Sequence, residues 1–100
     1  MSAAVVTPRF HPGRMMITRN AKDMLPRSEV NAAIDRHLHG DWGDVCPSDW
    51  QVNEDVLKRG GRLLSVYHTR DGVIFWIITE ADFSATTVLL PSDYSRGKAA

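Results

Sequence analysis

The sequence predicts an α+β domain in which two helices precede a three-stranded antiparallel β-meander. Two observations support this prediction. Apolar residues recur at helical spacing between residues 28 and 60, and from residue 62 onward the chain is rich in β-branched and aromatic residues. A length of 100 residues, of which 43% are hydrophobic and 24% charged, is typical of one folded domain. We therefore expect a single core.

The first predicted helix begins at Ser28, a residue type that favours the N-cap, and ends at Gly40, which can adopt the left-handed conformation after a helix. Between them, four apolar residues at helical spacing form one stripe: Val30, Ala33, Ile34 and Leu38. The second predicted helix begins at Ser48, which pairs with Gln51 as a capping box, and ends at Gly60.

The predicted strands run from Arg62 to His68, from Val73 to Thr79 and from Thr86 to Leu90. Residues 69–72 join the first two as a hairpin turn that ends in glycine. The second strand does not alternate between polar and apolar residues, which is typical of a central strand buried on both faces. Because two helices can cover only one face of this sheet, the other face needs a different cover.

The predicted domain begins at residue 14, after an N-terminal arm. Residues 1–13 contain two prolines and no periodicity, which predicts a loose arm, and residues 95–100 predict a frayed tail. Residues 14–94 form the predicted domain. Within it, residues 14–18 are a candidate strand, which makes the element order β-α-α-β-β-β, and residues 20–25 are a candidate single helical turn.

Cysteine content and hydropathy favour a cytoplasmic protein. Cys46 is the single cysteine, which excludes an internal disulfide, and the longest apolar run, Val73–Ile78, is far shorter than the roughly 20 residues of a membrane span. The 12 basic and 12 acidic residues cancel. Direct nucleic-acid binding is therefore not favoured, because neutralisation of phosphates supplies most of the affinity of such proteins.

The segment from residue 37 to residue 46 has the most unusual composition, and it allows three interpretations. As a metal site it would use His37, His39 and Cys46, although histidines two residues apart on a helix do not converge. As a connector between helices it would place Trp42 in the core. As a recognition surface it would extend into the second helix and present two tryptophans among acidic residues: Asp41, Trp42, Asp44, Asp49, Trp50 and Asp55.

Two further groups of residues are candidates for chemistry. Glu80 and Asp82 lie near Ser84, Thr86 and Thr87, and this set would act as an acid–base pair, hold a divalent cation, or cap its own loop. The last of these is the favoured interpretation.

The second group, His68 with Arg62 and Tyr67, would serve a ribonuclease. No established catalytic motif accompanies either group, so an enzyme is not favoured and no cofactor is expected.

Several short patterns resemble a family of small proteins carried on bacterial plasmids and integrative elements. They are R-H-x-x-G-D-W-G, Asn53, G-G-R-x-L-S-x-Y, W-I-I-T-E-A-D, S-x-T-T-x-L-L-P and Tyr94, and they span residues 36–94. The family often has a basic residue where this chain has Phe83, and residues 1–25 match poorly. The resemblance implies an accessory protein of a mobile genetic element and carries over no enzymatic activity.

From this resemblance and the acidic segment, the leading hypothesis is a protein that binds a protein or ribonucleoprotein complex of the host, such as a CRISPR–Cas complex, and inhibits it. One alternative is a ribonuclease, because the predicted order of elements is similar to that of RelE/ParE-type toxins. The other alternative is a homodimeric structural or regulatory module that completes its sheet through an edge strand.

Overall fold

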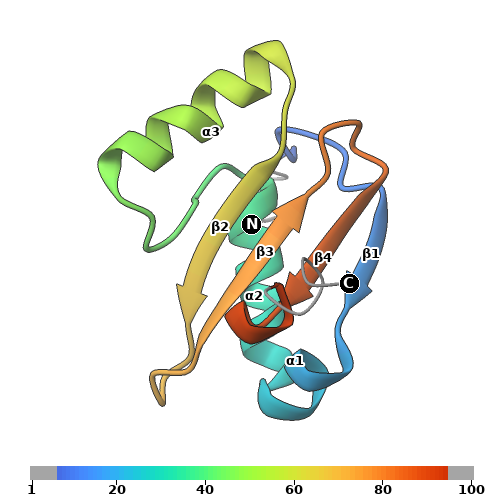
Figure 1. Ribbon diagram of the computed structural model, residues 1–100, viewed down its shortest axis with the longest axis vertical. Helices are drawn as coiled ribbons and strands as arrows, with labels where there is room; N and C mark the ends of the chain where they lie inside the picture. The colour runs from blue at the N-terminus through green and yellow to red at the C-terminus, as the bar shows by residue number, and fades with distance from the viewer. Residues whose placement is uncertain (1–6, 95–100) are drawn as a thin grey trace, which may run out of the picture.

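The computed structural model describes residues 7–94 and confirms the α+β class. A four-stranded mixed sheet forms its centre, with strand order β1-β4-β3-β2 (Figure 1). The helices and strands have these bounds: β1 Arg14–Ile17, α1 Arg19–Met24, α2 Arg27–Leu38, α3 Pro47–Arg59, β2 Leu63–His68, β3 Ile74–Thr79 and β4 Ala85–Leu89.

The predicted meander is present as β2-β3-β4. The turn between β2 and β3 closes through a hydrogen bond from the Gly72 N–H to the Thr69 carbonyl (2.9 Å), and Gly72 has φ 86°. This positive φ explains why glycine stands there, since other residues rarely adopt it. The candidate N-terminal strand also forms. It joins the sheet as β1, parallel to β4, so the sheet is mixed rather than a pure meander.

Helix α2 begins one residue before the predicted position, and Ser28 is not its N-cap. The N-cap is Pro26, whose carbonyl accepts hydrogen bonds from the N–H groups of Glu29 and Val30. The proline ring holds φ of Pro26 at −63°. No side chain forms a capping hydrogen bond at this start. The predicted end is confirmed, because His39 is the C-cap and Gly40 follows with φ 84°.

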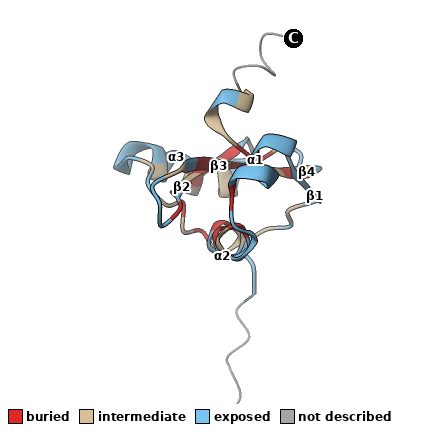
Figure 2. Ribbon diagram, turned by 90° about the horizontal axis from the view of Figure 1, so that it is seen from below, coloured by how far each residue is buried: buried red, intermediate tan, exposed pale blue. Residues whose placement is uncertain are grey.

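The predicted capping box of the second helix is wrong. Helix α3 begins at Pro47, which suits the first helical position because it has no N–H to leave unbonded. The Gln51 side chain turns forward to Asp55 instead of back toward Ser48. Of the two predicted helices, α2 covers a face of the sheet, while α3 lies alongside β2 (Figures 1 and 2). The expectation that both helices cover one face is therefore also wrong.

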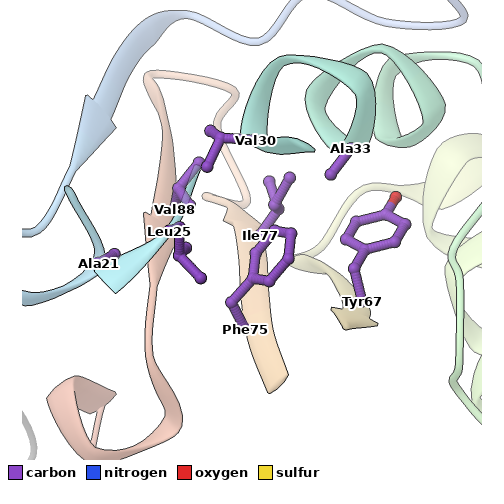
Figure 3. Packing of buried hydrophobic residues seen from close by; sticks show 8 residues of the cluster. All are labelled: Ala21, Leu25, Val30, Ala33, Tyr67, Phe75, Ile77 and Val88. Carbon is purple, nitrogen blue, oxygen red and sulfur yellow. The ribbon is translucent and has the colours of Figure 1, made fainter. Parts of the chain in front are cut away.

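The core lies between α2 and the inner face of the sheet. Figure 3 shows Val30 and Ala33 of α2 facing Tyr67, Phe75 and Ile77 of the sheet. Val88, with Ala21 and Leu25 from α1 and the residue after it, completes this cluster at the β4 side. The alternation of side chains along β2 and β4 places Tyr67 and Val88 on the inner face.

The outer face of the sheet is only partly covered. A helical turn at residues 91–94 lies on it, and the Trp76 and Tyr94 rings meet edge to face at 5.7 Å. Strand β3 is an inner strand of the sheet, but Ile74 is 53% exposed. The prediction that this strand is buried on both faces therefore holds for only part of its length.

Residues 7–13, assigned to a loose arm from the sequence, pack against the domain. The Phe10 ring stacks on Trp42 and Phe83, at centroid distances of 6.3 and 5.9 Å, and the Pro12 carbonyl accepts a hydrogen bond from the Thr86 hydroxyl (2.7 Å). Residues 1–6 and the predicted tail, 95–100, lie outside the described residues.

Candidate functional site

Trp42 is a core residue, as the connector interpretation predicts. Its exposed fraction is 0%, and its indole contacts the rings of Phe10 and His37. The indole Nε1–H donates a hydrogen bond to Glu54 Oε2 on α3 (2.9 Å), so Trp42 also ties α3 to the domain. A buried indole offers no surface to a partner, which removes Trp42 from the predicted recognition set.

Most carboxylates of the acidic segment have internal partners. Asp41 accepts two hydrogen bonds from the Arg36 guanidinium, which lowers the pKa of this carboxyl, and Asp44 lies 2.7 Å from His68 Nδ1. On α3, Asp55 accepts a hydrogen bond from Gln51. Asp49 is exposed and Trp50 half-buried. A role in partner binding for Asp49, Trp50 and Asp55 stays a prediction.

The three residues of the ribonuclease alternative do not converge. Tyr67 points into the core, where burial raises the pKa of its phenol, and its hydroxyl donates to the Asp41 carbonyl (2.6 Å). His68 follows it and faces the opposite side of the sheet. Arg62 precedes the other end of β2, where it donates to Tyr94 and Glu80. Side chains on two faces and at two ends of one strand share no substrate position.

The three residues of the metal-site alternative are not placed to bind one ion. His37 is buried within the core, His39 bonds the Asp35 carbonyl through Nδ1 (2.7 Å), and Cys46 is exposed at the start of α3. Among residues 7–94, no group of three or more His, Cys, Asp or Glu side chains is placed to hold a metal ion.

The polar cluster after β3 mainly caps its own loop. Asp82 accepts a hydrogen bond from the Ser84 N–H (3.0 Å), and contacts with Ser84 lower the pKa of this carboxyl. Glu80 pairs with Arg62 at 3.4 Å, and Thr86 is buried. Glu80 and Asp82 therefore have different partners, and this arrangement supports the capping interpretation.

A chain of hydrogen bonds runs through the buried residues from Ser65 to the Pro12 carbonyl. The donor and the acceptor of each bond can be assigned by starting at Pro12. Pro12 can only accept, so Thr86 donates to it and must accept from Thr79, 2.7 Å away. Thr79 then accepts from His37 Nε2–H (2.9 Å), which leaves His37 Nδ1 to accept from Ser65 (2.5 Å). Ser65 and His37 resemble a nucleophile and its base, but both are 0% exposed. The network is structural.

The outer edge of β2 is closed to further pairing. The Asn53 side chain bonds both the N–H and the carbonyl of Leu64, at 3.2 and 2.8 Å. Two residues on, the Val66 N–H donates to the Trp42 carbonyl and the Val66 carbonyl accepts from the Asp44 N–H. An amide side chain and the connector thus take the place of a neighbouring strand.

Replacing Asn53 with alanine is expected to lower the free energy of unfolding by about 2 kcal/mol, because two backbone groups lose a buried partner. Urea denaturation followed by circular dichroism measures this loss. Gln51→Ala on the exposed side of α3 is the matched control, and its effect should stay within about 0.5 kcal/mol. Equal effects of the two substitutions would contradict the role assigned to Asn53.

At the opposite edge of the sheet, no other strand of residues 7–94 pairs with the outer side of β1. All four residues of β1 are exposed, and they include three large apolar side chains, Met15, Met16 and Ile17. An apolar groove of about 470 Å³ lies between β1 and α2, lined by Met15, Met16, Ile17, Lys22, Leu25, Arg27, Val30, Asn31, Ile34 and Val88. Exposed apolar side chains gathered on a free strand edge are typical of an interaction site.

The groove carries positive charge and no negative charge. Lys22 and Arg27 line it, no acidic residue does, and neither makes an ion pair with any residue in the described part of the chain. The arginine–carboxylate pairs that do form, Arg9–Glu54, Arg36–Asp41 and Arg62–Glu80, lie outside the groove lining. We call β1 with these lining residues the β1 groove, and it is the best candidate site.

The sequence predicts a strand at residues 14–18 but does not predict a site there. The available signal was the run of apolar residues Met15–Ile17 between Arg14 and Arg19, an unusual pattern for a strand at an exposed edge.

Comparisons with known proteins add no relative: no protein-family model, no curated protein and no solved structure matches the chain. Within residues 7–94, no helix is both long and apolar enough to cross a membrane.

Proposed function

We propose that this protein is a binding module that acts by holding a segment of a macromolecular partner in the β1 groove. The observation that carries the proposal is the coincidence, at one place, of a sheet edge, exposed apolar side chains and cations that form no ion pair within residues 7–94. The predicted catalytic residues do not converge in this fold, which favours binding over catalysis.

The resemblance to proteins of mobile genetic elements suggests the partner. On that basis the partner is a protein or ribonucleoprotein complex of the host, and the consequence of binding is its inhibition, as for a complex of the CRISPR–Cas type. The β1 groove supplies a contact surface for such a partner and is independent of the acidic segment.

Replacing Ile17 with glutamate is expected to reduce the recovery of a co-purifying host protein at least about tenfold, because it puts a charge among the apolar contacts. Affinity capture from host lysate with quantitative mass spectrometry measures the recovery. Val52→Glu is the matched control, since Val52 is 54% exposed on α3 and Ile17 is 40% exposed. Equal recovery with both variants would exclude the β1 groove as the contact surface.

A further inference from the structure

We infer that the occupant of the β1 groove is an extended, acidic segment of a partner protein, which adds to the sheet as a fifth strand beside β1. This inference rests on the proposed function and names the chemistry of the partner. It follows from three features of the groove: the direction of the backbone groups of β1, the side on which its side chains lie, and its charge.

The backbone of β1 offers hydrogen bonds on its open side. The Arg14 N–H donates to the Ser84 carbonyl and the Thr18 N–H to the Val88 carbonyl, both at 3.0 Å. Because backbone groups alternate in direction along a strand, those of Met15 and Ile17 point away from β4. The opposite edge, at Leu64 and Val66, is already bonded by Asn53 and the connector. Strand addition is therefore directed to β1.

The side chains of β1 place apolar contacts on the groove side. Met15 and Ile17 are in register with Thr86 and Val88, whose side chains are buried on the inner face. A fifth strand would lie about 4.8 Å beyond β1, and every second side chain would enter the groove. A groove of about 470 Å³ accommodates a few such apolar side chains.

The positive charge of the β1 groove favours an acidic partner segment. Lys22 and Arg27 line the groove, Arg14 is the first residue of β1, and Arg19 is the first residue of α1. A second copy of this chain, paired through its own β1, would bring the same four cations to the interface, where like charges repel. An acidic segment supplies carboxylates to these cations and pairs its backbone with β1. Electrostatic complementarity therefore favours an acidic partner over a homodimer.

The first test uses random dodecapeptides displayed on phage and selected on the immobilised full-length protein, followed by NMR shift mapping of the selected peptides. The expected peptides carry Asp or Glu with apolar residues at every second position, and they shift the amides of β1 and the first turn of α2. Basic peptides, peptides with helical periodicity, shifts confined to other elements, or no enrichment would each overturn the inference.

The second test separates strand addition from general apolar contact. N-methylation of a peptide amide that faces β1 should weaken binding about tenfold or more, whereas N-methylation of the adjacent amide should have little effect. The double variant Lys22→Glu/Arg27→Glu should lose the acidic peptides at least about tenfold and keep the fold. Equal effects of the two methylations, or unchanged binding by the double variant, would contradict the model of an acidic fifth strand.

The outcomes distinguish this inference from the proposed function. If Ile17→Glu abolishes host-protein capture but no acidic peptide binds, the inference fails and the binding module stands. If capture is independent of Ile17, the proposed function fails. If light scattering shows a dimer that Ile17→Glu dissociates, the groove holds a second copy, and the acidic partner is excluded.

Discussion

Replacing Trp42 with alanine is expected to lower the free energy of unfolding by about 3–5 kcal/mol, the usual cost of removing a large buried aromatic side chain. Its indole is 0% exposed, contacts the rings of Phe10 and His37, and donates a hydrogen bond to Glu54. The substitution removes all three contacts at once. Because domains of this kind are stable by only about 5–15 kcal/mol, this loss is a large fraction of the total.

Thermal denaturation followed by circular dichroism measures the effect, and we expect the midpoint to fall by about 15 °C or more. Trp50→Ala is the matched control, because Trp50 is half-buried on α3 and its loss should cost about 1 kcal/mol. If Trp42→Ala does not fold, Trp42→Phe tests the same role, with an expected loss of about 1–2 kcal/mol from the missing N–H donor. Equal losses at Trp42 and Trp50 would contradict the core assignment.

The elements that the sequence predicts well are those with strong local signals. The hairpin turn at residues 69–72, the end of α2 at Gly40 and the change from helical to strand periodicity each depend on a few adjacent residues. The helix starts are predicted less well, because Pro26 and Pro47 determine them through the backbone while the better cap formers, Ser28 and Ser48, lie inside the helices.

The placement of α3 depends on contacts between distant residues, which explains why it was not predicted. Asn53 closes the edge of β2, and Glu54 bonds both Trp42 and Arg9, which lie 12 and 45 residues before it in the sequence. None of these pairs has a signature in local periodicity. The β1 groove has the same origin, since a strand from the start of the chain lies against β4 from its end.

The position of His37 was predictable and was missed. It continues the apolar stripe of α2 from Val30, Ala33 and Ile34, and this spacing places it inside. Ser65 alternates with the core residues Leu63 and Tyr67 along β2, so it also faces inward. A polar residue on a predicted apolar face therefore indicates a buried polar network here, rather than the ligand set considered for the segment from residue 37 to residue 46.

Lowering the pH from 7 to 4 is expected to destabilise the protein by about 3 kcal/mol through His37 alone. Burial lowers the pKa of this imidazole from 6.5 to about 4. Between these two values the unfolded chain binds a proton at His37 and the folded chain does not, so the free energy of unfolding falls as the pH falls. The contribution is complete above about pH 6.5, and a difference of 2.5 pKa units corresponds to about 3 kcal/mol.

The matched variant is His37→Gln, which retains a hydrogen-bonding side chain but does not titrate. At each pH, the free energy of unfolding of this variant is subtracted from that of the wild type. The subtraction removes the contributions of the other histidines and of Asp41 and Glu54, whose lowered carboxyl pKa makes stability fall near and below pH 4. Urea denaturation at pH 7, 6, 5 and 4 measures the difference. A difference that stays constant, or an NMR titration of the folded His37 imidazole near pH 6.5, would contradict a neutral buried histidine. Protonation adds a hydrogen at His37 Nδ1, so Ser65 must change from donor to acceptor, while the Nε2–H bond to Thr79 and the chain onward through Thr86 to Pro12 stay as they are. The destabilisation therefore comes from burying the charged imidazolium and not from losing these hydrogen bonds.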